Sequence, residues 1–276
     1  MRAARPDDAR ELLNYRKAFE LVSEYLSSGD LITEGLIREI HKRLVESVRG
    51  DQALPGQYRN VQNYIMNSRT GERIYTPPPL EVPQMMTDLV VRLQQETEIH
   101  PVVIAGVAHF QLVHIHPFLD GNGRTARLLS TLCLYKSGYD FKRLFTISEY
   151  YDRDRPSYYQ ALQSVREHQM DLTLWLEYFT EGLATHMREV QVTAEHVMRR
   201  DVILARARRK GLKERPVAIL AYLLEVGKAT VAECEGALKA NRRTVQRDLK
   251  LLIERSLVRE VGTSPTNPTN YYQPLL

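Results

Sequence analysis

Apolar residues recur every three or four positions along most of the 276-residue chain, which is the spacing of an amphipathic helix. The first two runs read ARELLNYRKAFELVSEYL (9–26) and LITEGLIREIHKRLVESV (31–48), and a Ser-Ser-Gly-Asp turn joins them. A short turn joins antiparallel neighbours, so these runs predict a helical pair. Further helices are expected over about residues 83–97, 102–114, 124–136, 155–167 and 172–209. The predicted fold class is therefore mainly α.

One segment before the C-terminal part breaks the helical pattern. Between residues 50 and 83, glycine and proline punctuate the sequence, and Pro77-Pro78-Pro79 stops it. Short β-branched and aromatic pieces flank Ser68-Arg69-Thr70-Gly71, as in a small hairpin. The segment from about 63 to 77 therefore predicts a loop with a β-hairpin.

Composition narrows the class of protein. Hydrophobic residues make up 43% and charged residues 26% of the chain, as in a folded cytosolic protein with one large and one small domain. No apolar run approaches the roughly 18 residues of a membrane span, and the first residues lack the apolar stretch of a signal peptide. Cys133 and Cys234 lie far apart, without metal-ligand spacing. We expect a cytoplasmic protein with no membrane partner, disulfide framework or zinc site.

Basic residues concentrate toward the C-terminus. Of the 38 Lys and Arg and the 34 Asp and Glu, 14 and 8 follow position 200, which gives that part a net charge of +6 and leaves −2 for residues 1–200. A charge step of this kind indicates a separate module with an acidic partner, of which nucleic acid is the commonest. A solvated basic face is the alternative that charge alone leaves open.

The stretch HIHPFLDGNGRTAR (114–127) separates two predicted helices, and core packing does not require this mixture of residues. Glycines at 121 and 123 permit positive φ and close backbone approach, so successive N–H groups can form an anion-binding nest. The next helix begins there, and its N-terminus also favours an anion. The loop over 116–123 therefore predicts a phosphate site, with a plain turn and a core histidine as the alternative.

Four side chains around this loop indicate phosphate chemistry. Arg124 and Arg127 lie three positions apart, so both can reach one side of the helix and clamp phosphate oxygens. Asp120 would repel a bare phosphate, but it suits Mg²⁺, which takes one or two carboxylates together with substrate phosphates. His116, just before the loop, is placed beside the phosphorus, where it could accept a proton as a general base with a pKa near neutrality.

These residues spell H-P-F-x-[D/E]-G-N-G-R-x-x-R, and the chain thereby resembles the Fic domain family of protein adenylyltransferases. The resemblance extends from about residue 8 to 186 and includes LNYRKAFE, IREIHKRL, PGQYRNVQNYI, YTPPPLEVPQMMTDL and YYQALQSVRE. It implies an all-helical Fic core that transfers AMP from ATP to a Tyr, Thr or Ser hydroxyl of a target protein or of itself, with Mg²⁺ as the cofactor.

The resemblance also implies a role for each residue of the motif. His116 would deprotonate the target hydroxyl, Asp120 would hold Mg²⁺, and Phe118 would anchor the loop. The ATP phosphates would be bound by Gly121, Asn122 and Gly123 as an anion hole, by Arg124 and, at the γ-phosphate, by Arg127. Kinase-like members carry Lys in place of Gly123, which argues against γ-phosphate transfer. Another nucleotide or a phosphocholine conjugate stays open as the donor.

Two other segments acquire a role through the same resemblance. The hairpin is similar to a flap that pairs with the target backbone by strand addition, with Ile74 and Tyr75 near the modified residue. Tyr158 and Tyr159 resemble the aromatics on the adenine side, although half-buried helix residues are the alternative. His114 is expected to be a core or supporting residue.

Regulation is the point at which the chain departs from the family pattern. Many members are restrained by a helix of pattern [S/T]-x-x-x-E-[G/N], whose Glu pairs with the residue that corresponds to Arg127. Three partial matches occur here, at Glu177, Glu189 and Glu260, and none completes the pattern. The sequence also starts at the first family helix. A separate inhibitory protein, a missing N-terminal inhibitory helix and a homodimer stay open, and the chain as given is expected to be active.

The C-terminal part has a pattern of its own. The helix RPVAILAYLLEVG precedes Thr230 and Glu233, which form a capping box, and NRRTVQRDLKLLIERSLV follows with Asn241 as its N-cap. LVREVG and NYYQP predict a strand pair. This order is typical of a winged helix-turn-helix, and RRTVQRDL resembles DeoR-like regulators. Unless the module binds protein instead, it would contact DNA through Arg242, Arg243, Thr244, Gln246 and Arg247.

The expected organisation is a Fic domain over 1–190, a connecting helix over 191–212 and a winged helix-turn-helix domain over 213–276. Two functions follow from it. The first is a protein adenylyltransferase with an accessory module. The second is a DNA-binding transcriptional regulator whose Fic domain senses nucleotide, acts on itself or transfers a different phosphate-containing group. The intact motif favours the first.

Overall fold

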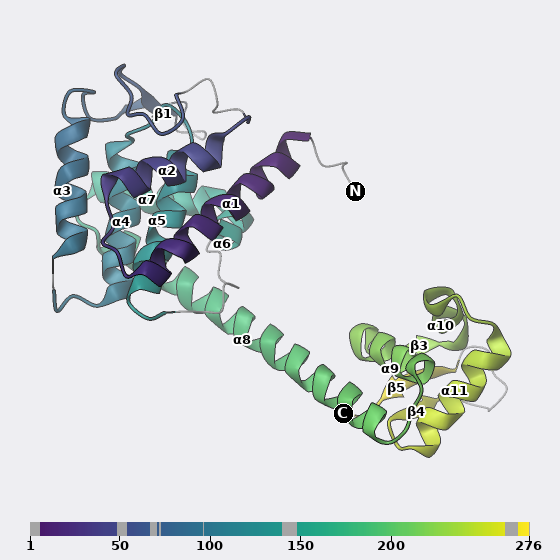
Figure 1. Cartoon of the computed structure of the whole chain (residues 1–276). Coiled ribbons are helices and arrows are strands. Elements are labelled where there is room, and N and C mark those ends of the chain that lie inside the picture. The colour runs from purple at the N-terminus through teal and green to yellow at the C-terminus, as the bar shows by residue number, and fades with distance from the viewer. Residues whose placement is uncertain are drawn as a thin grey trace. The chain divides into compact units, whose positions relative to one another are not determined.

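The computed structural model describes residues 6–48, 54–66, 71, 73–95, 97–139, 148–262 and 270–275. The protein is mainly helical with small antiparallel sheets, which confirms the predicted class (Figure 1). It divides into two compact units, Met1–Arg188 and Glu189–Leu276, and each has its own core. Cys133 and Cys234 are buried free thiols, one in each unit. Over the described residues, no helix is both long and apolar enough to cross a membrane.

Helices of the first unit fall close to the predicted runs. They are α1 (Pro6–Ser28), α2 (Glu34–Val45), α3 (Val82–Gln94), α4 (Pro101–Ile115), α5 (Asn122–Lys136), α6 (Ser148–Arg153), α7 (Arg155–Glu167) and the first turns of α8 (Thr173–Arg209). Local signals fix their starts, since Thr33 caps α2 and the Asp154 carboxylate caps α7. α6 was not predicted, because a helix of 6 residues is too short to show a period.

The core of the first unit surrounds α4, which packs against α3 and α5, while α2 contacts α1 and α5 (Figure 1). Gly106 lets α4 and α8 approach closely, because a Cβ there would lie 2.8 Å from Leu176 Cδ2. The Trp175 indole N–H donates to the Gly106 carbonyl over 2.8 Å. The two helices on either side of the motif loop, α4 and α5, are therefore fixed by core packing.

The hairpin consists of β1 (Tyr64–Met66) and β2 (Arg73–Tyr75), paired antiparallel with Tyr64 opposite Tyr75 and Ile65 opposite Ile74. Both strands lie within the segment 63–77 that predicted them. Of the expected turn residues Ser68-Arg69-Thr70-Gly71, the first three lie outside the described residues. Ile65 and Ile74 are half-buried while Tyr64 and Tyr75 are exposed, so the hairpin turns one apolar face toward the protein.

The second unit contains the last turns of α8, α9 (Glu214–Val226), β3 (Ala229–Thr230), α10 (Val231–Leu238), α11 (Arg242–Glu254), β4 (Val258–Val261) and β5 (Tyr271–Pro274). Its strands are antiparallel in the order β3-β5-β4. The capping box of Thr230 and Glu233 and the Asn241 cap are both present, as predicted. β3 was not predicted, because a strand of 2 residues has no readable alternation.

Candidate active site

His116 lies where α4 ends, and its backbone is left-handed, with φ 51° and ψ 57°. Its Nδ1 lies 3.2 Å from the Val113 carbonyl oxygen. A carbonyl can only accept, so Nδ1 carries the proton and Nε2 keeps a lone pair. Burial lowers the pKa of His116 to about 4, and the positive charges of Arg59 and Arg166 act in the same direction. This pKa lies below the near-neutral value expected from the sequence, because burial disfavours the charged ring, and His116 therefore presents the neutral tautomer that a general base would need.

The loop after His116 is closed by Asn122. The Asn122 side chain is 2% exposed; it accepts the Phe118 N–H over 2.9 Å and donates to the Phe118 carbonyl over 2.8 Å. Both ends of the amide are thus used inside the loop. What Asn122 can offer an anion is its backbone N–H, together with those of Gly123 and Arg124, because the first N–H groups of a helix have no acceptor within it.

Gly121 is required both by its backbone and by its neighbours. It caps α5 with φ 77° and ψ 0°, a left-handed conformation that favours glycine. A Cβ at this position would lie 2.7 Å from Val45 Cγ1 and 3.2 Å from His41. The N–H and the hydroxyl of Thr125 both donate to the Gly121 carbonyl over 3.0 Å. Gly121 thus sets the direction in which α5 leaves the loop.

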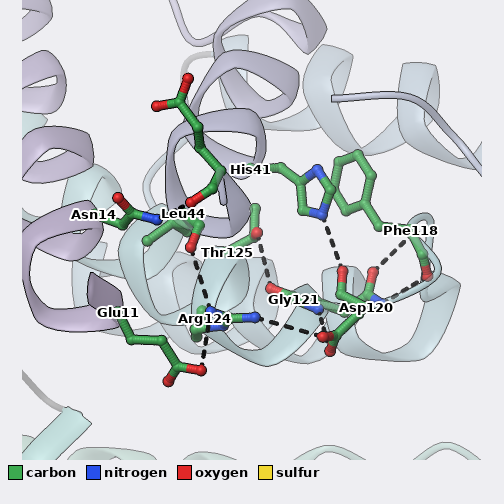
Figure 2. A network of polar contacts seen from close by, with 11 residues as sticks. Glu11, Asn14, His41, Leu44, Phe118, Asp120, Gly121, Arg124 and Thr125 are labelled. Atoms are coloured by element: carbon green, nitrogen blue, oxygen red, sulfur yellow. Dashed lines mark hydrogen bonds and ion pairs between the residues drawn. The ribbon is translucent and has the colours of Figure 1, made fainter. Parts of the chain in front are cut away.

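His41 of α2 holds the loop through its ring, as Figure 2 shows. The Gly56 N–H donates to His41 Nδ1 over 2.9 Å, so Nε2 carries the proton and donates to the Asp120 carbonyl over 2.9 Å. The ring stacks on Phe118, with centroids 3.7 Å apart, and both side chains are fully buried. Burial lowers the pKa of His41 to about 4, which keeps the ring neutral.

A cavity of about 580 Å³ opens beside His116, which is a size that suits a small-molecule site. The hairpin, α4, α5 and α7 all contribute to its wall. It brings together six of the predicted site residues, namely Ile74, His116, Gly123, Arg127, Tyr158 and Tyr159. Tyr75 lines a cavity of about 460 Å³ that shares Ile74, His114 and Arg166 with the first, so the two cavities adjoin.

Arg124 is separated from Arg127, although the sequence predicted that both reach one side. Its Nη1 donates to the Leu44 carbonyl over 3.3 Å, and its guanidinium lies 3.6 Å from Asp120 Oδ2 and 3.9 Å from Glu11 Oε1 (Figure 2). Among the described residues that line the larger cavity, Arg127 is present and Arg124 is not. The Leu44 carbonyl of α2 and the Glu11 carboxylate of α1 hold Arg124 on the side of the loop that faces these two helices.

Asp120 fits the Mg²⁺ that the motif implies. Its side chain is 53% exposed; Oδ1 accepts the Gly121 N–H over 2.7 Å, and Oδ2 faces Arg124. The part of the chain that the structure describes holds no group of three or more His, Cys, Asp or Glu that could bind a metal. One exposed carboxylate is compatible with Mg²⁺, which completes its coordination with water and substrate phosphates.

The two tyrosines predicted on the adenine side differ in exposure. Tyr158 is 4% exposed, and its hydroxyl forms a hydrogen bond of 2.8 Å with His109 Nε2, next to Tyr151 and Trp175. Tyr159 is 53% exposed and lines the larger cavity. Tyr159 is therefore the one whose ring is accessible to a base.

Two residues of the site were not predicted. His41 binds the backbone of Asp120 from 79 positions away, and Arg59 binds the backbone of His116 from 57 positions away. His41 lies in a run whose spacing predicts a helix, and Arg59 lies in a stretch that resembles the family, but no local signal in either one indicates the partner.

Residues 31–134 match the family model described as Fic/DOC family. The relatives include the protein adenylyltransferases Fic of Drosophila grimshawi, 35% identical over 133 residues, and Culex quinquefasciatus, 36% identical over 136 residues. Each match covers 48% of this chain and 26% of the relative, so the chain spans about a quarter of the length of these relatives.

Solved structures agree on the fold. A Fic family protein from Desulfovibrio desulfuricans G20 aligns with a TM-score of 0.64 at 24% identity, over 99% of this chain and 77% of that chain. Fic-1 (aa134–508) from C. elegans aligns with a TM-score of 0.57 at 25% identity, over 71% of this chain and 54% of that chain. These likenesses show that the chain shares the fold of these solved structures over the parts that align.

Proposed function

We propose that the protein is a Mg²⁺-dependent protein adenylyltransferase, which transfers AMP from ATP to a Tyr, Thr or Ser hydroxyl of a target protein or of itself. One observation carries this proposal. His116, with its lone pair on Nε2, lines the same cavity as Gly123 and Arg127. Attack of a hydroxyl on a phosphate requires a general base for the hydroxyl proton and groups that bind the phosphate, and this one cavity would supply both.

The reaction exchanges one phosphate bond for another. The target hydroxyl attacks the α-phosphorus of ATP, the new O–P bond forms, the bond to the bridging oxygen breaks, and pyrophosphate leaves. His116 accepts the hydroxyl proton on Nε2 during the attack. Because burial lowers the pKa of His116, the imidazolium readily returns this proton to solvent after transfer.

The negative charge of the phosphates would meet positive partners at the start of α5. The N–H groups of Asn122 and Gly123 lie at the positive end of the helix dipole, and Arg127 would bind the γ-phosphate. Mg²⁺ held by Asp120 would neutralise charge on the α- and β-phosphates. Arg124 contacts the Asp120 carboxylate, so it would orient this metal ligand. To bind phosphate as well, Arg124 would exchange its contacts with the Leu44 carbonyl and Glu11.

The hairpin would bind the target segment. Strand edges present backbone groups that an extended peptide can pair with, and Ile74 and Tyr75 of β2 would then lie near the modified residue. Adenine would lie between the apolar side chains of the hairpin and Tyr159, with Tyr158 supporting Tyr159 from the core.

Incubation with α-labelled ATP, Mg²⁺ and a cell lysate tests the proposal. The wild type is expected to label protein, and His116→Ala is expected not to. Parallel reactions with γ-labelled ATP, other labelled nucleotides and a phosphocholine conjugate identify the donor. Labelling from the γ-position alone, or equal labelling by the variant, would contradict adenylyl transfer by His116.

We further propose that the second unit is a winged helix-turn-helix domain that binds DNA. Its support is the order of its elements together with the exposed side chains of Arg242, Arg243, Gln246 and Arg247 on α11, where Thr244 is half-buried. Arg242 pairs with Glu235 at 3.7 Å and Arg247 with Asp248 at 3.8 Å. Both arginines are at least half-exposed, so their guanidinium groups are accessible to phosphate.

Fluorescence anisotropy of the full chain with duplex DNA at several salt concentrations tests DNA binding. We expect affinity to fall steeply with salt, and the double variant Arg242→Ala, Arg247→Ala to bind more weakly with a shallower salt slope. No binding at low salt would favour a protein-interaction module. DNA binding without any AMP transfer would favour a transcriptional regulator whose first unit senses nucleotide.

A further inference from the structure

Arg59 is 3% exposed, and every described acceptor of its guanidinium is a backbone carbonyl. Nε donates to His116 over 2.8 Å, Nη1 to Val61 over 3.1 Å, and Nη2 to Pro77 over 2.6 Å and to Ile115 over 3.3 Å. The Arg59 N–H adds a bond of 2.8 Å to the Pro117 carbonyl. A single residue thus binds two distant parts of the chain.

On one side these bonds hold the end of α4. The carbonyls of Ile115 and His116 lack donors within the helix, and the negative end of the helix dipole attracts a cation. His116 also has a left-handed backbone, which a non-glycine residue adopts only with support from its surroundings. Arg59 supplies that support to the residue proposed as the base.

The same guanidinium also bonds to the two segments that flank the hairpin, since Val61 precedes β1 and Pro77 follows β2. Asn63 adds a second link between the hairpin and the loop. Its side chain donates to the Phe118 carbonyl over 3.3 Å, and the Thr76 hydroxyl donates to the Asn63 carbonyl over 3.2 Å. The base of the hairpin and the loop after His116 are therefore bonded to each other.

The volume of the side chain alone does not explain why residue 59 is an arginine. Burial lowers the pKa of Arg59, which shows that its charge is desolvated, and an apolar residue of similar volume would avoid that cost. A planar guanidinium can bind several carbonyls in different directions, whereas the donors of Lys all leave one atom. Arg59 therefore fixes the positions of its carbonyl partners relative to one another.

The geometry points to Arg59 as a positioning residue for adenylyl transfer, which sets the place of the target-binding hairpin relative to His116. This inference rests on the proposed function. Arg59 is not among the described residues that line the larger cavity, so it acts through His116 and the hairpin and not by touching ATP.

The charge of Arg59 allows this role to be tested through a second quantity, the pKa of His116. The charged groups that act on His116 are Arg59 before β1, Arg166 on α7 and Asp120 in the loop. Burial lowers the pKa of His116 most; the hydrogen bond to the Val113 carbonyl raises it, the two arginines lower it and Asp120 raises it. Removal of the Arg59 charge should therefore raise the pKa of His116. A loss of packing that exposes His116 would raise this pKa as well, so Arg59→Lys, which alters the packing but keeps the charge, separates the two causes.

The test compares Arg59→Gln and Arg59→Lys with the wild type and with Arg38→Gln as a matched control. Arg38 also donates to a backbone carbonyl of the neighbouring segment, that of Gly56 over 2.6 Å, and its hydrogen-bond partners among the described residues include neither His116 nor the hairpin. We would measure automodification at saturating α-labelled ATP, ATP affinity, the melting temperature, and the His116 pKa by NMR of the full chain with labelled histidine.

Arg59→Gln is expected to transfer AMP roughly 10- to 100-fold more slowly, with ATP affinity changed less than about threefold, and to raise the pKa of His116 by roughly half a unit or more. Arg59→Lys should slow transfer yet keep the pKa of His116, because the charge remains. If Arg59→Gln matches Arg38→Gln in rate and in the pKa of His116, Arg59 is not a positioning residue. If the wild type itself transfers nothing while the pKa shifts as expected, adenylyl transfer fails and the link between Arg59 and His116 stands.

Discussion

Arg59 donates from Nε to the carbonyl oxygen of His116 over 2.8 Å, although the two residues are 57 positions apart in the sequence. The bond reaches the candidate base at the position where the backbone of α4 becomes left-handed. The segment that leads into the hairpin therefore helps to place the base, together with the motif itself.

The transfer rate is expected to persist at acidic pH. Burial lowers the pKa of His116 to about 4, so the base stays neutral above that value and is lost only as the pH falls through it. We expect the rate at about pH 6 to exceed half the rate at about pH 7.5. ATP affinity measured at each pH separates weaker binding from a protonated base. A rate that halves near pH 6.5 with ATP still bound would show that His116 titrates as an exposed histidine does.

Asp120→Asn should abolish the stimulation of transfer by Mg²⁺ while it preserves the fold. Asn keeps the oxygen that accepts the Gly121 N–H but lacks the charge that a hard cation prefers. We expect transfer at saturating Mg²⁺ to fall by about tenfold or more and the melting temperature to stay close to that of the wild type. Undiminished transfer by the wild type in chelator would contradict the assignment of Asp120 as a metal ligand.

Gly121→Ala should lower the free energy of unfolding by roughly 2 kcal/mol or more, because Ala at φ 77° is strained and its Cβ would meet Val45 at 2.7 Å. Gly123→Ala is the matched control, two positions further on. Its Cβ would make an ordinary contact of 3.6 Å with Arg127, in a helix where Ala is favoured by about 1 kcal/mol. Chemical denaturation measures both. Equal destabilisation by the two variants would be incompatible with the role assigned to Gly121.

Automodification is expected without an activating mutation. Of the three partial matches to an inhibitory helix, Glu260 accepts hydrogen bonds from Asn270 and Tyr272 within the second unit, and Glu177 is exposed on α8. Replacement of Glu177, Glu189 or Glu260 by Gly should each change automodification by less than about twofold. If the parent is silent and one replacement raises the rate by roughly tenfold or more, that glutamate restrains the site.

Features that are complete within a short stretch of sequence could be predicted. The capping box at Thr230 and Glu233 and the Asn241 cap each lie within one helical turn, and the helical runs carry their own period. The motif from His116 to Arg127 is contiguous, so its residue types alone indicated a base, a metal ligand and an anion site.

Features that depend on distant partners could not be predicted. Spacing on α5 placed Arg124 and Arg127 on one side, but Glu11 of α1 and the Leu44 carbonyl of α2 draw Arg124 away. The ring of His41 reaches Asp120 across 79 positions, and nothing in the residues around His41 indicates that partner. Sequence patterns thus assigned a chemistry to the loop, which stays a prediction, and missed the residues that hold the loop in place.

The central claim is that His116 transfers AMP, and intact-mass spectrometry of the purified chain after incubation with ATP and Mg²⁺ tests it most directly. The wild type is expected to gain the mass of one or more AMP groups, and His116→Ala, which should retain its fold and its ATP affinity, is expected to gain none. An adduct on His116→Ala as abundant as on the wild type would contradict the account, as would a wild type that gains a phosphoryl group in place of AMP.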